Sequence, residues 1–218
     1  MPEPITLVAV GSGFVGVAIH LARRYFSAAK EVVDVLLGAV AFVIWLPIML
    51  VCVVIIKVAS KGPILLSQVR VGRDGEPFRM YKFRTMYADA EADSGPVWAS
   101  HRDPRVVPAC RWMRISHMDE LPQIINVIKG EMSLVGPRPE RPEILRELEK
   151  CYPDVRKRLA VKPGITGLAQ IRNGYDASVD GFRHKLDADL EYIANRKWSL
   201  EFAILLRTLG KLKDTRAR

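Results

Sequence analysis

The adjacent carboxylates Asp119 and Glu120 are the residues of this chain whose types and spacing best suit chemistry. Pro122 follows them, and because proline is tolerated only in a first helical turn, it predicts a helix that starts near Asp119. The free amides and the positive dipole end of such a helix favour anions beside the acidic pair. The competing interpretation is that Asp119 is an ordinary N-cap, a position at which Asp is strongly preferred.

The stretch after the acidic pair predicts a short amphipathic helix and then a stiff turn. The apolar residues of the helix recur on one helical face, at Leu121, Ile124, Ile125 and Ile128. Gly130 ends the helix. Residues 136–139, GPRP, form a rigid turn around one cation, because proline fixes its own backbone angle. A second turn-rich run, residues 162–167, is suited to presenting backbone amides to a phosphate.

Residues 64–84 predict a β-hairpin. Two short strand-like runs, 64–71 and 77–84, are joined around Asp74-Gly75, a dipeptide typical of tight turns. The second run alternates cations with aromatic residues, a pattern that suits gripping phosphates or stacking a base. A half-buried strand with a solvated basic face explains the same pattern. The cations are Arg79, Lys82 and Arg84.

Charge is unevenly distributed along the 218 residues, of which 49% are hydrophobic and 26% are charged. Residues 1–56 hold three basic and three acidic side chains, so the formal net charge of +9 lies in residues 57–218. A basic domain after an apolar leader indicates an anionic partner: nucleic acid, anionic lipid or a phosphorylated substrate. Cys52, Cys110 and Cys151 lack the spacing of a disulfide framework or a zinc site.

Residues 35–56 carry no charged side chain and would extend about 33 Å as a straight helix, the thickness of a bilayer core. Pro47 lies inside this run and should kink or break the helix. Basic residues flank the run on both sides, so both of its ends prefer the cytoplasmic side of a membrane. These features favour a re-entrant helix that enters and leaves through one leaflet, with a kinked transmembrane span as the alternative.

Residues 5–22 form an earlier apolar segment, in which Gly11 to Gly16 match the dinucleotide-binding pattern GxGxxG. That fold requires a second strand with an acidic residue about 20 residues later. Asp34 is in range, but a membrane-like run follows it in place of a strand and a crossover helix. The competing interpretation is a membrane or interfacial helix.

The C-terminal part predicts a helix over residues 182–195 and another over 198–212. Asp187 and Asp189 form a DxD motif in the first of these, but residues i and i+2 of a helix point about 200° apart and chelate a metal poorly. The second helix is amphipathic. It is suited either to the surface of a bilayer or to packing against the domain core.

With these motifs in place, residues 30–212 resemble the bacterial sugar transferase family, whose monotopic phosphoglycosyl transferases start glycan assembly on a polyprenol carrier. The matching runs follow the family's order and include SKGPILLSQVRVGRDGEPFRMYKFRTM, MDELPQIINVIKGEMSLVGPRPE and KPGITGLAQ. DELPQ, SLVGPRP and KPGITG at these separations are highly specific. The run Tyr175–Val179 is similar to members that serve exopolysaccharide assembly.

The resemblance implies an α+β fold in three parts. Residues 1–29 would form an N-terminal apolar helix, spanning or interfacial, and residues 30–59 a re-entrant membrane helix broken near Pro47. Residues 60–218 would form a cytoplasmic catalytic domain of helices with a short β-hairpin or sheet and amphipathic helices at the membrane surface. The implied location is the cytoplasmic face of a bacterial inner membrane.

The resemblance also implies a reaction. Asp119 would attack the phosphorus next to the sugar of a UDP-sugar, release UMP and pass the sugar phosphate to a polyprenol phosphate such as undecaprenyl phosphate. Glu120, together with Asp119, would bind Mg²⁺, a hard cation that offsets charge on phosphate oxygens. The product would start an exopolysaccharide or another glycan.

Candidate substrate-binding residues are the cations and prolines that these motifs place around the acidic pair. Arginine offers a fork that matches the geometry of phosphate oxygens. The candidates are Lys82, Arg84, Arg114, Pro137, Arg138, Pro139 and Arg172. His117 is left outside the site, because a histidine next to a turn is more often a surface or cap residue.

Two other functional classes stay open. A basic membrane-attached adaptor or nucleic-acid binder would explain the positive charge, but not an acidic pair among the cations. A DxD-type glycosyltransferase with a nucleotide fold would need strands alternating with helices over a longer chain. We therefore expect membrane lipid but no nucleic acid as a partner. The sequence leaves open the sugar and whether the chain forms a homodimer.

Overall fold

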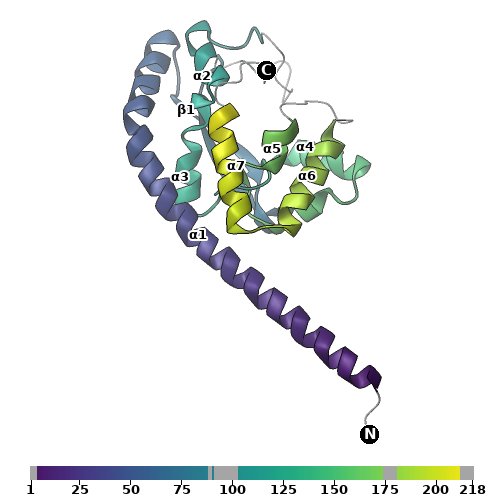
Figure 1. Ribbon diagram of the computed structural model, residues 1–218. Helices are drawn as coiled ribbons and strands as arrows, with labels where there is room; N and C mark the ends of the chain where they lie inside the picture. Colours follow the sequence, from purple (N-terminus) through teal and green to yellow (C-terminus); the bar gives the residue numbers. More distant parts are fainter. Residues whose placement is uncertain (1–3, 88–89, 91–102, 174–180, 212–218) are drawn as a thin grey trace.

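The computed structural model describes residues 4–87, 90, 103–173 and 181–211, which form one long helix lying against an α+β domain (Figure 1). The predicted mixed class is therefore confirmed. The run Tyr175–Val179 lies outside the described residues. The elements, in chain order, are α1 (Pro4–Ala59), β1 (Leu65–Val71), η1 (Arg73–Gly75), β2 (Pro77–Phe83), η2 (Pro108–Cys110), α2 (Arg111–Ile115), η3 (Met118–Glu120), α3 (Gln123–Ile128), β3 (Ser133–Val135), α4 (Pro142–Cys151), η4 (Val155–Ala160), β4 (Gly164–Thr166), α5 (Leu168–Asn173), α6 (Phe182–Ala194) and α7 (Trp198–Lys211), where η marks a 3₁₀ helix.

Helix α1 runs from Pro4 to Ala59 without interruption. The GxGxxG motif therefore lies inside a helix and does not follow a strand, so the dinucleotide-binding interpretation is wrong. The helix also continues through Pro47, so one curved helix replaces the two helices predicted around a break (Figure 1). Proline removes one backbone hydrogen bond of a helix and bends it, but the bonds on both sides of the bend persist.

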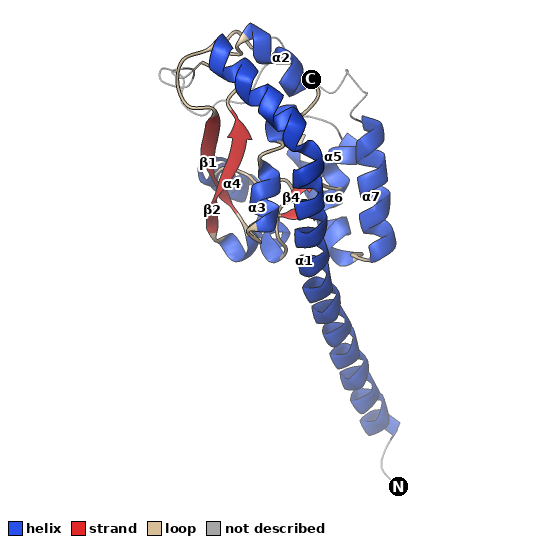
Figure 2. Ribbon diagram, turned by 90° about the vertical axis from the view of Figure 1, so that its left-hand side faces the viewer, coloured by secondary structure: helices blue, strands red, loops and turns tan. Residues whose placement is uncertain are grey.

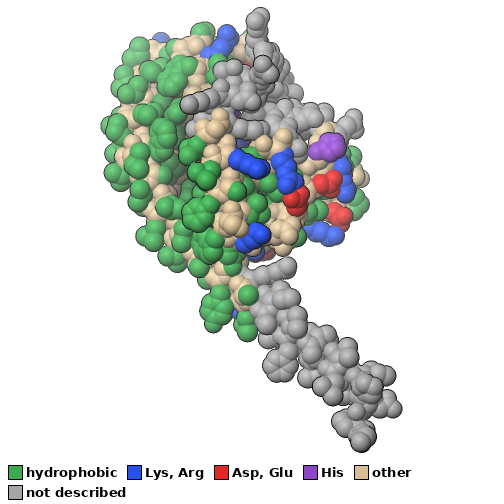
Figure 3. All heavy atoms as spheres, viewed as in Figure 1, with side chains coloured by type: hydrophobic (Ala, Val, Ile, Leu, Met, Phe, Trp, Pro, Cys, Tyr) green, Lys and Arg blue, Asp and Glu red, His purple; other side chains and the backbone are tan. Residues whose placement is uncertain are grey.

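Helix α1 has two different sides. On the side of the domain, Met49, Cys52 and Ile56 are buried in a core cluster that also contains Phe83, Val107, Cys110 and Met113. The opposite side exposes a row of large apolar residues: Val32, Leu36, Val40, Val43, Ile44, Leu50, Val51, Val54 and Val58. Figure 3 shows apolar side chains over much of this part of the molecule. By length and composition, the segment Arg24–Ala59 is able to cross a membrane.

The predicted β-hairpin is confirmed. Strands β1 and β2 pair antiparallel from Leu65 opposite Phe83 to Val71 opposite Pro77. Asp74 and Gly75 in the connection have left-handed φ angles of 58° and 87°, which explains the choice of these residue types. Figure 2 shows the hairpin at one edge of the domain, with α3 between β2 and α1.

A second, parallel two-stranded sheet brings the two predicted turns together. Strand β3 pairs with β4, Ser133 opposite Gly164 and Val135 opposite Thr166. The backbones then approach so closely that a Cβ on Gly164 would overlap the backbone of Gly136. The amide of Gly164 donates to the carbonyl of Pro137 at 2.9 Å. The backbone of the neighbouring segment therefore uses the amide of Gly164, and phosphate binding by the other amides of residues 162–167 stays a prediction.

The buried face of α3 differs from the predicted one. Ile124 is buried as expected, but Ile128 is 37% exposed. Asn126 is fully buried instead, because its side chain bonds to the backbone of β2: Oδ1 accepts from the amide of Tyr81 at 3.0 Å, and Nδ2 donates to the carbonyl of Arg79 at 2.7 Å. A polar residue that completes a strand edge cannot be found from hydrophobic periodicity.

Helix α7 packs against the domain core, one of the two alternatives that its sequence left open, and contact with a bilayer stays a prediction. Ile204 is fully buried, and Glu201 on the same side is buried in contact with Tyr192 of α6. The other side exposes Phe202, Leu206 and Leu209. One side of α7 therefore packs on the domain, while the other presents an apolar surface.

Candidate active site

The acidic pair lies in η3, two residues before α3 begins. The predicted helix start at Asp119 is therefore wrong, and so is its N-cap role, because Pro122 occupies the cap position of α3. The amide of Glu120 is already used, since it donates to the carbonyl of His117 at 3.1 Å. His117 has a left-handed φ of 57°, which turns the chain from α2 into η3. A backbone turn that precedes the helix thus positions the pair.

The acidic pair lies where the long apolar helix meets the domain. Asp119 and Glu120 are 7% and 8% exposed. Met118 and Leu121, the residues on either side of them, pack against the core cluster that α1 helps to form. Asp119 is also within electrostatic range of Cys52 in α1. Its carboxylate is therefore next to the membrane-type helix.

Two cations hold Glu120. Lys82 Nζ lies 3.0 Å from Glu120 Oε1. Arg138 binds the same carboxylate through both arms, with Nη2 2.6 Å from Oε1 and Nη1 3.1 Å from Oε2. Bidentate guanidinium–carboxylate contacts of this kind fix orientation as well as charge. Strand β2 and the Pro137–Pro139 turn thus meet at Glu120.

Burial and neighbouring charges shift the pKa of Glu120 in opposite directions. Burial raises the pKa of its carboxyl, but the charges and hydrogen bonds of Arg138 and Lys82 outweigh burial and hold this pKa well below its ordinary range. Burial lowers the pKa of Lys82, and the charge of Glu120 opposes that shift. Glu120 is therefore ionised at neutral pH.

Replacing Lys82 with methionine should move the acid limb of the pH–rate profile to higher pH. The substitution removes one of the two cations that lower the pKa of Glu120, so the carboxylate should become protonated at a higher pH than in the wild type. A carboxylate whose pKa is lowered by folding stabilises the folded state at pH values above its unfolded-state pKa. This stabilisation is lost as the pH falls through the folded-state pKa. The measurement is kcat/KM for the reaction proposed below, over the pH range in which circular dichroism shows the variant folded.

The matched control is Lys150→Met, which removes an exposed cation paired with Glu147 on the surface of α4. Its profile should coincide with that of the wild type. If the acid limbs of Lys82→Met and the wild type lie at the same pH, Glu120 does not determine the acid limb.

Three of the predicted substrate-binding cations have partners other than Glu120, and their role in substrate binding stays a prediction. Arg84 is buried and donates to the backbone carbonyls of Ser60 and Lys61, the two residues that follow α1. Arg172 pairs with Glu191 on an exposed surface between α5 and α6. Arg114 is half-buried in α2, within electrostatic range of Asp103. The structure places none of the three in contact with Glu120. Pro137 and Pro139 are buried and flank Arg138.

Arg70 is a member of the site that the motifs did not reveal. It lies on β1, opposite Phe78, so it shares a sheet face with Lys82 of β2. Arg70 Nη1 donates to the carbonyl of Pro139 at 3.1 Å. Burial lowers the pKa of Arg70 to about 10, and the charge of Glu140 opposes that shift. The hairpin register would have indicated Arg70, because cross-strand partners point to the same face.

The donors of the acidic pair fit Mg²⁺ in the presence of a substrate. Among the described residues, no cluster of three or more His, Cys, Asp or Glu side chains is suited to a metal. Mg²⁺ is commonly held by one or two carboxylates together with substrate phosphates and water, and Asp119 and Glu120 supply the carboxylates. Glu120 retains acceptor capacity beside its two ion pairs, because a carboxylate has about four lone-pair sites.

Comparison with known proteins places this site in a family. Residues 25–214 match the family model described as bacterial sugar transferase. The chain is 38% identical over 201 residues, 89% of its length, to a UDP-glucose:undecaprenyl-phosphate glucose-1-phosphate transferase of Caulobacter vibrioides, of which the match covers 73%. It is 38% identical over 184 residues, 84% of its length, to a UDP-N-acetylgalactosamine-undecaprenyl-phosphate N-acetylgalactosaminephosphotransferase of Aeromonas hydrophila.

Some relatives are longer than this chain. The match covers 43% of the Aeromonas hydrophila protein. It covers 39% of a UDP-glucose:undecaprenyl-phosphate glucose-1-phosphate transferase of Escherichia coli, to which the chain is 37% identical over 187 residues, 84% of its length. The match to the family model nevertheless includes the long apolar helix from residue 25, the hairpin and the whole site around Glu120. The chain therefore belongs to the bacterial sugar transferase family.

Proposed function

We propose that this protein is a phosphoglycosyl transferase that moves a sugar 1-phosphate from a UDP-sugar to a membrane polyprenol phosphate, with undecaprenyl phosphate as the expected acceptor. One observation carries the proposal. The acidic pair lies between the core cluster of α1 and the cations Lys82 and Arg138. A water-soluble anionic donor and a lipid acceptor can both reach that junction. The names of the relatives, which are sugar phosphotransferases acting on undecaprenyl phosphate, support this assignment.

In the first step, a carboxylate oxygen of Asp119 attacks the phosphorus bonded to the sugar. The bond from this phosphorus to the bridging oxygen breaks, and UMP leaves with the electron pair. The product is a phosphosugar ester on Asp119. Arg138, Lys82 and Arg70 provide positive charge around the acidic pair, which lowers the cost of bringing a diphosphate next to two carboxylates.

In the second step, a phosphate oxygen of the polyprenol phosphate attacks the same phosphorus and the carboxylate of Asp119 leaves. The protein then returns to its starting state, and a lipid-linked diphosphate sugar starts an exopolysaccharide or another glycan. Glu120, with Asp119, would hold Mg²⁺, which supplies charge neutralisation to the phosphate oxygens. The ion pairs with Lys82 and Arg138 keep Glu120 ionised and oriented for that role.

The packing of α1 supports attachment to one face of a membrane. Lys30 forms a buried ion pair with Glu201 of α7, with 2.8 Å between Nζ and Oε2. Ile56, 26 residues later along the same helix, is buried in a cluster with Val107. Both ends of this segment therefore contact the same domain. A perpendicular crossing would draw that charged domain into the bilayer, whereas a helix that curves at Pro47 and stays within one leaflet inserts only its exposed apolar side.

Cysteine labelling tests this arrangement. In a background with Cys52, Cys110 and Cys151 replaced by alanine, single cysteines at the exposed positions Ala28 and Lys61 should react with a membrane-impermeant maleimide from the same side of oriented vesicles. We expect that side to be the cytoplasmic face of the inner membrane. Labelling from opposite sides would establish a transmembrane span.

The released nucleotide tests the reaction itself. Wild-type protein in a membrane mimetic, with Mg²⁺ and a panel that includes UDP-glucose and UDP-N-acetylgalactosamine, should release UMP from at least one sugar nucleotide. An enzyme that transfers only the sugar would release UDP, and a non-catalytic adaptor would release neither product. The panel would also identify the sugar.

The geometry of the DxD motif argues against a DxD-type glycosyltransferase. Asp187 is exposed and pairs with Arg183 of the same helix. Asp189 is buried and pairs with Arg158. The two carboxylates therefore serve different partners and do not form one chelate, as the helical spacing predicted.

A further inference from the structure

Residues 137–140, here called the PRPE segment, have an unusual backbone environment. Each of their four consecutive carbonyl oxygens accepts a hydrogen bond from a different donor. In order, the donors are the Gly164 amide at 2.9 Å, Arg158 Nη2 at 2.9 Å, Arg70 Nη1 at 3.1 Å and the Val71 amide at 3.0 Å. Proline also fixes φ at two of the four positions. The segment is therefore held along its whole length, and it presents Arg138 to Glu120.

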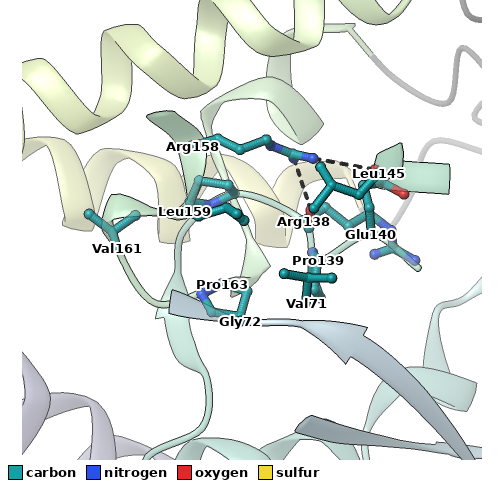
Figure 4. A pocket seen from close by; sticks show the side chains of 11 residues that line it. Val71, Gly72, Arg138, Pro139, Glu140, Leu145, Arg158, Leu159, Val161 and Pro163 are labelled. Carbon is teal, nitrogen blue, oxygen red and sulfur yellow. Dashed lines mark hydrogen bonds and ion pairs between the residues drawn. The ribbon is translucent and has the colours of Figure 1, made fainter. Parts of the chain in front are cut away.

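Arg158 is the donor to the Arg138 carbonyl, and it is itself fixed in place. Its side chain is 4% exposed. Nε and Nη2 lie 3.1 and 2.7 Å from Asp189 Oδ2, and Nη1 lies 3.6 Å from Glu140 Oε1. Figure 4 shows Arg158 directed at the PRPE segment, with its contacts to Arg138 and Glu140 marked. Three acceptors thus orient a single guanidinium group.

The Arg158–Asp189 pair is poorly explained by stability alone. Buried ion pairs cost desolvation and are often replaceable by apolar residues without loss of stability. Asp189 is only 2% exposed. An apolar pair could fill the same space, but it could not donate a hydrogen bond to the carbonyl of the residue that binds Glu120. The position of that hydrogen bond indicates that the charged pair serves to hold the backbone of Arg138.

We propose that Arg158, held by Asp189, is a positioning residue for the reaction. By fixing the Arg138 carbonyl, it aligns the Arg138 guanidinium for its bidentate contact with Glu120. Neither Arg158 nor Asp189 touches the acidic pair in any contact that the structure describes. The inference rests on the proposed function, in which Glu120 is required for phosphoryl transfer.

A double-mutant cycle tests the proposal. Arg158→Lys keeps the positive charge, but a single ammonium cannot reproduce the forked contacts with Asp189 and the Arg138 carbonyl. We expect kcat/KM for UMP release to fall by roughly 10- to 100-fold, the scale seen when residues supporting a catalytic ligand are replaced. In an Arg138→Lys background, the same change should cost less than about threefold, because the contact that Arg158 aligns is already weakened.

A matched control separates positioning from general destabilisation. Ile204→Val shortens a fully buried side chain of α7 and lowers stability in a core cluster whose members lie outside the PRPE segment. Its effect on kcat/KM should be the same in both backgrounds. If Arg158→Lys folds poorly, Asp189→Asn serves as a second variant. It keeps one acceptor oxygen, and it should show a smaller loss with the same non-additivity.

Hydrogen exchange provides a measurement that needs no activity. The amide of Gly164 donates to the first carbonyl of the PRPE segment and the amide of Val71 to the last. Arg158→Lys should therefore accelerate the exchange of both amides at least tenfold, while Ile204→Val should not. If the effects of Arg158→Lys and Arg138→Lys on kcat/KM simply multiply in active protein, the positioning role is overturned. Should the wild type release no UMP from any UDP-sugar, the proposed function fails, and the two exchange rates alone then decide whether Arg158 holds this segment.

Discussion

Replacing Asp119 with asparagine should reduce UMP release by roughly four orders of magnitude or more, the scale of losses measured when a covalent nucleophile is removed. Asparagine preserves the size of the buried side chain, which is 7% exposed in the wild type. Its amide, however, cannot form the phosphosugar ester that the proposed reaction requires. The variant should therefore fold normally and fail at the first chemical step.

Mass spectrometry makes this expectation specific. After incubation with the UDP-sugar and Mg²⁺ but without a polyprenol phosphate acceptor, wild-type protein should carry the mass of a sugar phosphate on the peptide that contains Asp119. Asp119→Asn should carry none. Asp187→Asn is the control, because it alters an exposed carboxylate paired with Arg183. An active wild type with unmodified Asp119 would exclude the covalent mechanism.

Replacing Glu120 with glutamine should lower both activity and stability, for separable reasons. Loss of the carboxylate removes the expected Mg²⁺ ligand, and we expect kcat/KM to fall by roughly 100- to 1000-fold, as for removal of one electrostatic stabiliser of a transition state. Lys82 and Arg138 would also keep their charge without its partner. Breaking a buried pair costs about 3–5 kcal/mol of unfolding free energy, and we expect the lower end, because the Arg138 side chain is 29% exposed.

The double variant Glu120→Gln/Lys82→Met separates the two effects. Removing the buried ammonium of Lys82 should restore part of the lost stability, because β2 then carries no buried ammonium without a partner. Activity should stay as low as in Glu120→Gln. Thermal unfolding in detergent and UMP release measure the two quantities on the same samples. Recovery of both would show that Glu120 serves only to neutralise Lys82.

The sequence identified the site residues best where chemistry is local. The adjacent carboxylates, the proline-flanked Arg138 and the hairpin connection at Asp74-Gly75 were all recognisable from their immediate neighbours. Residue spacing was also enough to predict that Asp187 and Asp189 diverge, since the helical period sets their directions. The start of α3 was misplaced because proline is acceptable at an N-cap as well as in a first turn, and a 3₁₀ turn precedes it.

The cations were harder to assign. Lys82 and Arg84 are two residues apart, so strand periodicity gives them the same direction, yet only Lys82 reaches Glu120. Strand β2 ends at Phe83, and the Arg84 side chain donates to the carbonyls of Ser60 and Lys61, just after α1. Among the neighbouring cations Arg156, Lys157 and Arg158, only Arg158 is buried. No local signal distinguishes these residues, because their partners are distant in sequence.

The sequence by itself determined the mixed fold class, the apolar leader and the acidic pair, because each follows from residues close together in the chain. The tertiary structure decided which cations bind Glu120, since Lys82 and Arg138 lie 38 and 18 residues away from it. It also decided that α1 contacts the domain at both ends of its apolar run, and that hydrogen bonds donated to the four carbonyls of residues 137–140 hold the segment that carries Arg138. Burial of charge is the physical reason: a buried ion needs a partner, and only folding determines which oppositely charged group can reach it.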